Sequence, residues 1–277
     1  MNLQLQPSEP RFRLSAASLL ALTFGVAVFS GGCGLLHGEK KELEFEPVRH
    51  RAYYSCPRKV TPVVLDGKLD EVAWQYAAPV REFSMAPGHR PPTNPTRGLL
   101  TWDDRHLYVA FDATDPAIEA TRTERDSRTY KDDVLEVFFK TDPREWDYYN
   151  VEINALGAFR DGYHTPEKRF NAVWNCPGLE VGVHVEGTLN DPTDRDEGWQ
   201  LEVAIPFACL PTLEGRTPEP GDVWLFHLAR IDRSPRLEEG REMISTAPME
   251  EPRFHSSEKW LPLVFAGPRH STNEETR

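Results

Sequence analysis

Two neighbouring segments, 134–139 and 148–155, alternate their side chains with a period of two, and this pattern limits the possible folds most. Successive side chains of a β-strand point to opposite faces, so each segment predicts a strand with one face rich in apolar residues. The connecting residues 141–147 contain Thr, Asp and Pro and predict the turn of a hairpin.

Pairing across this hairpin predicts that Glu136 lies opposite Glu152, on the face turned away from the core. A third short strand at 159–161 would place Arg160 opposite Glu152. Like charges that face each other across strands destabilise a sheet. We therefore expect Arg160 within ion-pair distance of at least one of these carboxylates.

The rest of the chain favours an all-β fold. Short apolar runs with turn residues between them extend to residue 265, and 24 prolines and 18 glycines in 277 residues leave little room for long helices. These features predict a single antiparallel β-sandwich with short helical turns over residues 58–266. The net charge of -12 and the lack of a basic stripe exclude nucleic acid as an expected partner.

The N-terminus has the pattern of an export signal. Arg11 and Arg13 precede an apolar run at 14–29, which is followed by small residues and Cys33. We interpret residues 1–33 as a signal peptide with a lipoprotein-like cysteine.

In this interpretation Cys33 becomes the acylated anchor, so that the protein is an exported cell-envelope component, with the outer membrane as the expected site. The chain would touch the membrane only through its N-terminal lipid. Cleavage by an ordinary signal peptidase, which yields a soluble secreted protein, is the alternative. Residues 34–57 read as a tether, and residues 267–277 as a disordered tail.

Three cysteines remain after Cys33, and export places them where disulfides persist. Cys209 follows an apolar strand and is interpreted as a buried thiol. Cys56 and Cys176 each precede a proline in a loop-like setting, and they form the expected pair if a disulfide exists.

Several motifs, in their order and spacing, resemble family 9 carbohydrate-binding modules. The motifs that carry the resemblance are Asp66–Glu71 with Trp74, Leu100–Asp104, Leu107–Ala110, Asp132–Phe138, Gly198–Pro206 and the segment 254–265. The resemblance covers residues 58–266 and implies a single β-sandwich, in agreement with the strand pattern.

The resemblance also implies a binding site. In this family two aromatic rings hold a terminal sugar, and the matching positions are Tyr130 and Phe254. A glutamate that meets the sugar hydroxyls matches Glu136, and an asparagine on the next strand matches Asn154. The family's arginine position is Glu152 here, and Arg160 would act in its place.

Other residues have plainer interpretations. The tryptophans Trp74, Trp102 and Trp199 are expected in the core. Trp174 could supply a missing aromatic ring, and His255 is the histidine expected near the site.

The acidic pair at 132–133 could cap a turn or hold a structural cation, so calcium is possible although no cofactor is expected. The nine histidines show no metal-ligand spacing.

These expectations favour noncatalytic binding of the end of a glycan or polysaccharide. A glycoside-cleaving enzyme that uses Glu136 and Glu152 is one alternative, and a purely structural envelope role is another. A third is a haem-carrying electron-transfer sandwich, for which Met85, Met243 and Met249 are the candidate ligands.

Overall fold

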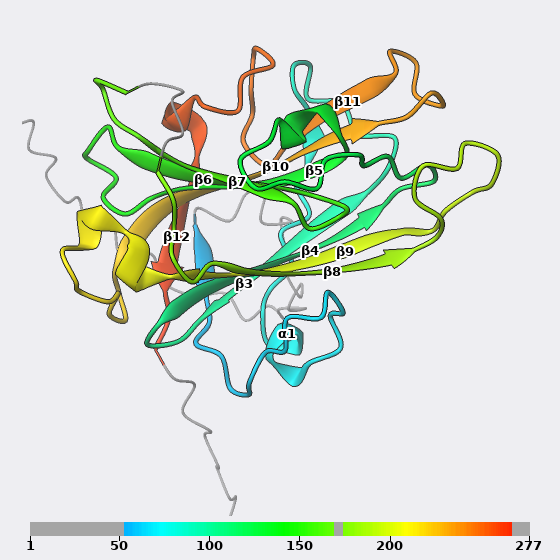
Figure 1. Ribbon diagram of the computed structural model, residues 1–277. Coiled ribbons are helices and arrows are strands. Elements are labelled where there is room, and N and C mark those ends of the chain that lie inside the picture. The colour runs from blue at the N-terminus through cyan, green and yellow to red at the C-terminus, as the bar shows by residue number, and fades with distance from the viewer. Residues whose placement is uncertain (1–52, 169–173, 268–277) are drawn as a thin grey trace, which may run out of the picture. The chain divides into compact units, whose positions relative to one another are not determined.

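The computed structural model describes residues 53–168 and 174–267, which form two β-sheets stacked face to face (Figure 1). The larger sheet has eight strands and contains the central hairpin. Its main order is β1 (Tyr54–Cys56), β12 (Leu261–Phe265), β10 (Val223–Arg233), β5 (Val134–Lys140), β6 (Tyr148–Asn154) and β7 (Phe159–His164). Two further strands, β11 (Arg241–Ser245) on β10 and β2 (Ser84–Met85) on β11, complete it.

The smaller sheet has four strands in the order β3 (Thr96–Trp102), β4 (His106–Thr114), β9 (Gly198–Pro206) and β8 (Glu180–Glu186). Helical structure is limited to short turns. These are α1 (Val72–Gln75), η1 (Thr129–Lys131), η2 (Phe207–Cys209), η3 (Pro211–Leu213) and η4 (Ser257–Lys259). The all-β sandwich predicted from the sequence is therefore confirmed. In the part of the chain that the structure describes, no helix is long and apolar enough to cross a bilayer.

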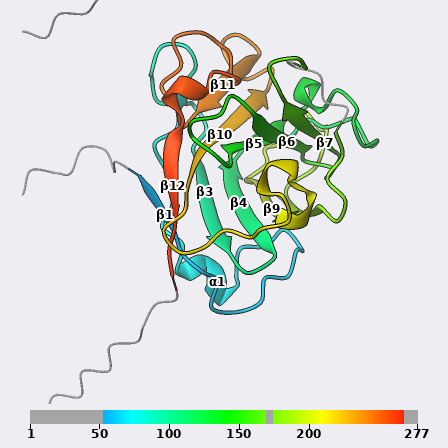
Figure 2. The ribbon, with the colours of Figure 1, turned by 90° about the vertical axis from the view of Figure 1, so that its left-hand side faces the viewer.

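The pairing of named strands is antiparallel except at one edge, where β1 runs parallel to β12 (Figure 2). This edge corrects the predicted tether of residues 34–57, because residues 54–56 already belong to the sheet. Tyr54 and Cys56 point into the core and are buried, and this burial holds the short strand in place. The signal peptide, Cys33 and residues 268–277 lie outside the described residues.

The strands of the central hairpin pair in the register that the sequence predicts. Glu136 pairs with Glu152, and Glu152 pairs with Arg160. One face of β5, with Leu135 and Val137, is buried between the two sheets, and the opposite face carries Glu136. The hairpin therefore supplies both the core and one wall of the site described below.

Apolar residues form a central core between the sheets and two outer clusters. Trp102 and Trp199 belong to the core, as predicted. A second cluster covers part of the outer face of the large sheet, where Phe138 packs against Phe254 and Trp260. Burial of apolar surface stabilises a fold at roughly 25 cal/mol per Å², so the outer clusters hold the surrounding loops onto the sheets.

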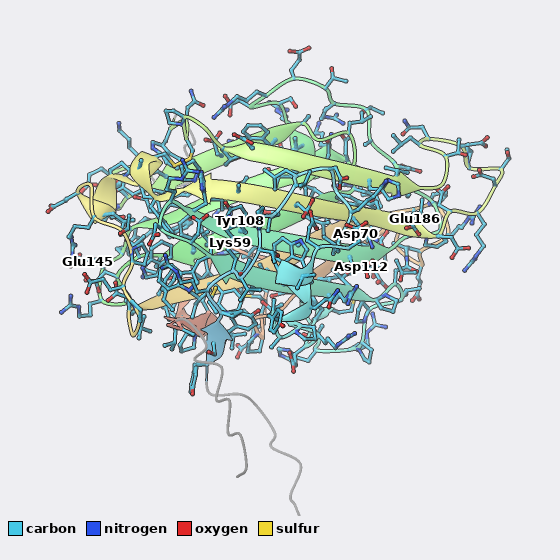
Figure 3. All side chains as sticks on the ribbon, turned by 90° about the horizontal axis from the view of Figure 1, so that it is seen from below. Lys59, Asp70, Tyr108, Asp112, Glu145 and Glu186 are labelled. Atoms are coloured by element: carbon cyan, nitrogen blue, oxygen red, sulfur yellow. A yellow bond between two sulfur atoms is a disulfide. The ribbon has the colours of Figure 1, made fainter. Side chains whose placement is uncertain are left out.

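The third cluster lies beneath α1 on the outer face of the small sheet, where Lys59 and Tyr108 are neighbours (Figure 3). Trp74, expected in the core, is buried in this cluster instead of between the sheets. Its indole Nε1 donates to Glu202 Oε1 at 2.8 Å, and the backbone N–H of Gly67 donates to Glu202 Oε2 at 3.0 Å. These bonds satisfy a buried carboxyl group, which would be costly to leave unpaired.

The disulfide joins Cys176 and Cys209, with a Cα–Cα distance of 5.1 Å, and corrects the predicted pairing of Cys56 with Cys176. Cys176 precedes β8 and Cys209 follows β9. Because β8 and β9 are antiparallel neighbours, the start of one strand lies beside the end of the other. Cys56 lies on β1 in the other sheet and is a buried free thiol.

Candidate functional site

A pocket of about 630 Å³ opens on the outer face of the large sheet. Strands β5, β6 and β7 supply Glu136, Asn150, Glu152, Arg160 and His164, and β10 and β11 supply a second wall. The connection from β11 to β12 and the short helix η1 complete the lining. The pocket is therefore built by segments that are far apart in the sequence.

Glu136, Asn150 and Glu152 lie side by side in the sheet beneath this pocket, because they occupy one face of β5 and β6. Asn150 Nδ2 donates to Glu152 Oε1 at 3.2 Å, and the hydroxyl of Thr129 donates to Glu152 Oε2 at 3.2 Å. Both carboxyl groups are buried, with only 3% of Glu136 and 6% of Glu152 exposed. They are reached from the pocket and not from the open surface.

Burial raises the pKa of Glu136 well above its ordinary value, and the neighbouring Glu152 raises it further. Burial also raises the pKa of Glu152, whereas the positive charge of Arg160 opposes this rise. The pair therefore holds a proton more readily than two free carboxylates would. A carboxyl group beside a carboxylate can both donate to and accept from sugar hydroxyls.

Arg160 lines the same pocket opposite Glu152, but its predicted ion pair is wrong. Among the described residues, no ion pair within 4.0 Å joins Arg160 to either Glu136 or Glu152. The strand register is right, yet a long side chain can extend past its direct partner. The positive charge of Arg160 therefore lowers the pKa of both carboxyl groups without an ion pair.

Two histidines belong to the pocket, namely His255, expected there from the sequence, and His164. His164 Nε2 donates to Asn150 Oδ1 at 2.7 Å, and His255 Nδ1 lies 2.9 Å from the Tyr148 hydroxyl. Burial is the main cause that lowers the pKa of His164 to about 4 and that of His255 to about 3. Both rings are therefore neutral at pH 7.

The structure brings Tyr130 and Phe254 to the same pocket, in agreement with the arrangement that the resemblance implies. Tyr130 lies in η1 and is half-buried. Phe254 is only 4% exposed, and its ring packs 6.3 Å from Phe138 and 5.7 Å from His227. Phe254 therefore belongs to the outer apolar cluster as well as to the pocket, because the β11–β12 connection folds down onto the sheet.

Asn154 does not line the pocket, which corrects its predicted contact with a ligand. Its Nδ2 donates to Asp132 Oδ2 and to the Arg122 carbonyl oxygen, each at 2.8 Å. Its Oδ1 accepts from the backbone N–H of Ala158 at 2.9 Å. Asn154 therefore stabilises the turn after β6, and the amide in the pocket is Asn150.

The pocket residues that the sequence did not assign to the site include Arg233 on β10, and Arg241 and Met243 on β11. The strand β11 was not predicted at all. The alternation in 148–155 could have revealed Asn150, because it lies two residues before Glu152 on the same face. Nothing in the local sequence places β11 beside β10, since that pairing is a long-range contact.

A separate buried cluster of Asp115, Asp133 and Asp232 could hold a cation, since a carboxylate oxygen of each lies within 4.8 Å of the others. Arg230 Nη2 already lies 3.1 Å from Asp115 and 2.9 Å from Asp232. Burial, the largest cause, raises the pKa of Asp115 to about 6. Protonation of a carboxyl group and the positive charge of Arg230 can therefore offset the repulsion among the three aspartates without a metal ion, and calcium stays a prediction. Asp132, the other member of the predicted pair, is ion-paired instead.

The remaining predicted residues lie in other surroundings. Met249 is 3% exposed within the outer apolar cluster, whereas Met85 is on β2. Trp174 packs against the central core, 5.1 Å from Tyr149, and is not part of the pocket lining. It therefore does not replace an aromatic ring of the site.

The fold and the pocket together define a β-sandwich domain with a ligand-sized site on one outer sheet face. The model of one family, described as carbohydrate family 9 binding domain-like, matches residues 65–264. The chain belongs to this family of carbohydrate-binding domains.

Two curated relatives are much longer proteins. Endo-1,4-beta-xylanase A of Thermoanaerobacterium saccharolyticum is 27% identical over 168 residues, which are 61% of this chain and 12% of that protein. Exoglucanase XynX of Acetivibrio thermocellus is 26% identical over 155 residues, which are 56% of this chain and 12% of that protein. The match thus spans about an eighth of each relative.

Solved structures share the fold at low sequence identity. A putative carbohydrate-binding protein from Bacteroides uniformis has a TM-score of 0.57 at 16% identity, with 77% of this chain and 99% of that chain covered. A family 9 carbohydrate-binding module from Caldicellulosiruptor kristjanssonii in complex with cellotriose has a TM-score of 0.52 at 15% identity, with 81% and 97% covered. The same organism's family 9 module in complex with glucose has a TM-score of 0.51 at 15% identity, with 79% and 99% covered.

Proposed function

We propose that this domain binds the end of a glycan noncatalytically in the pocket formed on the large sheet. The observation that carries the proposal is the meeting of Tyr130 and Phe254 with the buried Glu136, Asn150 and Glu152 in one pocket. An aromatic face suits the apolar C–H face of a sugar, while amide and carboxyl groups bond its hydroxyls. Membership of a carbohydrate-binding family, and relatives solved with cellotriose and glucose, support it.

The strength of binding follows from the size of the contact. A single sugar stacked on one ring gains no more than the roughly 1–3 kcal/mol found for base–aromatic stacking. Hydroxyl contacts add to this gain and lost association entropy subtracts from it, so we expect a Kd between about 1 μM and 1 mM.

Calorimetry with cellotriose tests the proposal. We expect the change Tyr130→Ala to weaken binding at least tenfold, because it removes a half-buried ring that lines the pocket. The matched control is Tyr76→Ala, which removes a 42% exposed ring just after α1, on the outer face of the other sheet. Equal affinities of the wild type and the Tyr130 variant would place the binding site elsewhere.

A second candidate is glycoside cleavage, and the direct pairing of Glu136 with Glu152 favours it. Opposed strand residues have Cβ atoms about 4.5–5.5 Å apart, and retaining glycosidases hold their carboxyl groups about 5–5.5 Å apart. Chromatography of cellotriose after long incubation separates the two proposals. If the trisaccharide stays intact, the result supports binding without cleavage. If the wild type forms shorter products and the Glu136→Gln variant does not, the protein is an enzyme.

We also propose that Cys33 is acylated and anchors the domain in the cell envelope, on the basis of the basic and apolar pattern of residues 11–29. The change Cys33→Ala should abolish lipid labelling and release the protein from the membrane fraction. An unchanged mass and unchanged membrane association in this variant would support a different mode of attachment.

A further inference from the structure

The pocket carries more positive charge than the binding of a neutral sugar requires. Four arginines line it, namely Arg160, Arg233, Arg241 and Arg253. The acidic side chains in the lining are Glu136 and Glu152, and burial raises the pKa of both. Arg253 has its own partner, because its Nε lies 3.0 Å from Glu251 at the surface.

Arg233 and Arg241 are direct neighbours across β10 and β11, as are Ile231 and Met243 on the same wall of the pocket. Two like charges at opposed positions of antiparallel strands destabilise the sheet. In the described residues, neither guanidinium forms an ion pair within 4.0 Å with a carboxylate. This wall of the pocket therefore holds two cations whose charge the neighbouring chain does not balance by direct contact.

The surroundings of Arg233 add a second observation. Its Nη2 donates to the carbonyl oxygen of Tyr130 at 2.8 Å, which fixes the guanidinium beside the aromatic residue of the pocket. Its Nε is buried and has no hydrogen-bond partner in the described chain. Burial is the largest cause that lowers the pKa of Arg233, and the charge of Arg241 lowers it further, whereas the charges of Asp133 and Asp132 oppose this. A buried donor without a partner costs free energy, so the protein itself does not fully satisfy the hydrogen-bonding groups of this guanidinium.

We propose that the pair Arg233 and Arg241 recognises a carboxylate on the bound sugar, so that the preferred ligand is an acidic glycan containing uronic acid. The inference rests on the proposed function of the same pocket. The planar guanidinium fork matches the two coplanar oxygens of a carboxylate and pairs with them through two parallel hydrogen bonds. A carboxylate near both side chains would also offset their mutual repulsion. The net charge of -12 of the whole chain disfavours nonspecific capture of polyanions, so the recognition would be local.

Two trisaccharides that differ only at C6 test this inference. Cellotriose has hydroxymethyl groups there, whereas the trisaccharide of β-1,4-linked glucuronic acid has carboxylates on the same linkage. In calorimetry at pH 7 and 150 mM salt, we expect the uronate to bind at least tenfold more tightly than cellotriose. Its affinity should fall with added salt, while that of cellotriose should not.

The variant Arg241→Gln assigns the preference to this wall of the pocket. It should weaken uronate binding about tenfold, and cellotriose binding by a clearly smaller factor. Arg241 is exposed, so this substitution should leave the fold stable. The control Arg144→Gln removes the same charge from an 86% exposed side chain in the loop between β5 and β6, and it should change neither affinity.

The following outcomes would overturn the acidic-glycan inference. Equal binding of both trisaccharides, or equal losses in the Arg144 and Arg241 variants, would overturn the acidic-glycan inference and leave the glycan site intact. Tighter binding of a sulfated cellotriose than of the uronate would also overturn it, in favour of a sulfate ester. If neither trisaccharide binds, both proposals fall together.

Discussion

The disulfide between Cys176 and Cys209 permits a quantitative prediction, because it closes a loop of known length. The two cysteines are 33 residues apart in the sequence. In the chain-entropy model, cross-linking a loop of this length stabilises the folded state by about 3.7 kcal/mol at 25 °C. The double change Cys176→Ser and Cys209→Ser should therefore lower the free energy of unfolding by about this amount.

For a domain of this size, each kcal/mol shifts the Tm by roughly 2–4 °C, so the variant should melt about 7–15 °C below the oxidised wild type. Adding a reductant to the wild type should produce a similar drop. The control is Cys56→Ala, which alters a buried free thiol and should keep its full sensitivity to the reductant. Thermal melts followed by circular dichroism, with and without reductant, measure all of these differences.

Peptide mapping under nonreducing conditions identifies the bridge directly. We expect a linked peptide that contains Cys176 and Cys209, and a Cys56 thiol that reacts with iodoacetamide only after unfolding. A linked peptide that contains Cys56 and Cys176 would refute the pairing in the structure. An unchanged Tm in the double variant would instead refute the loop-entropy reasoning.

Two further predictions concern the pocket. Phe254→Ala should lower the free energy of unfolding by about 3 kcal/mol, which is the lower end of the range for a buried phenylalanine because one side of the ring borders the pocket. Tyr130→Ala should lower it by less than about 1 kcal/mol. Urea unfolding measures both changes, and equal losses would contradict the difference in burial. The pKa of His164 is about 4 and that of His255 about 3, against about 6.5 in an unfolded chain, so their stabilising contribution is fully present above pH 6.5 and is lost as the pH falls toward 4. In melts between pH 7.5 and 4.5, His255→Gln should therefore lose less stability than the wild type, and parallel curves would contradict this account.

Local periodicity determined the central hairpin. The side-chain period of a strand is two, so the alternation decides which residues share a face, and the short hairpin connection decides which residues are opposed. This reasoning correctly placed Glu136 opposite Glu152 and Glu152 opposite Arg160. Antiparallel pairing of the consecutive strands β8 and β9 would likewise have brought Cys176 beside Cys209.

Tertiary contacts decided the rest of the site. The burial of Phe254 depends on a connection that folds back onto β5, and the position of Arg241 depends on the pairing of β11 with β10. Asn154 and Asn150 share a face of β6, yet only the contacts of Asn154 with Asp132 and a nearby turn remove it from the pocket. A strand period fixes the face of a residue, but the partner that covers that face comes from a distant part of the chain, and the local pattern carries no information about it.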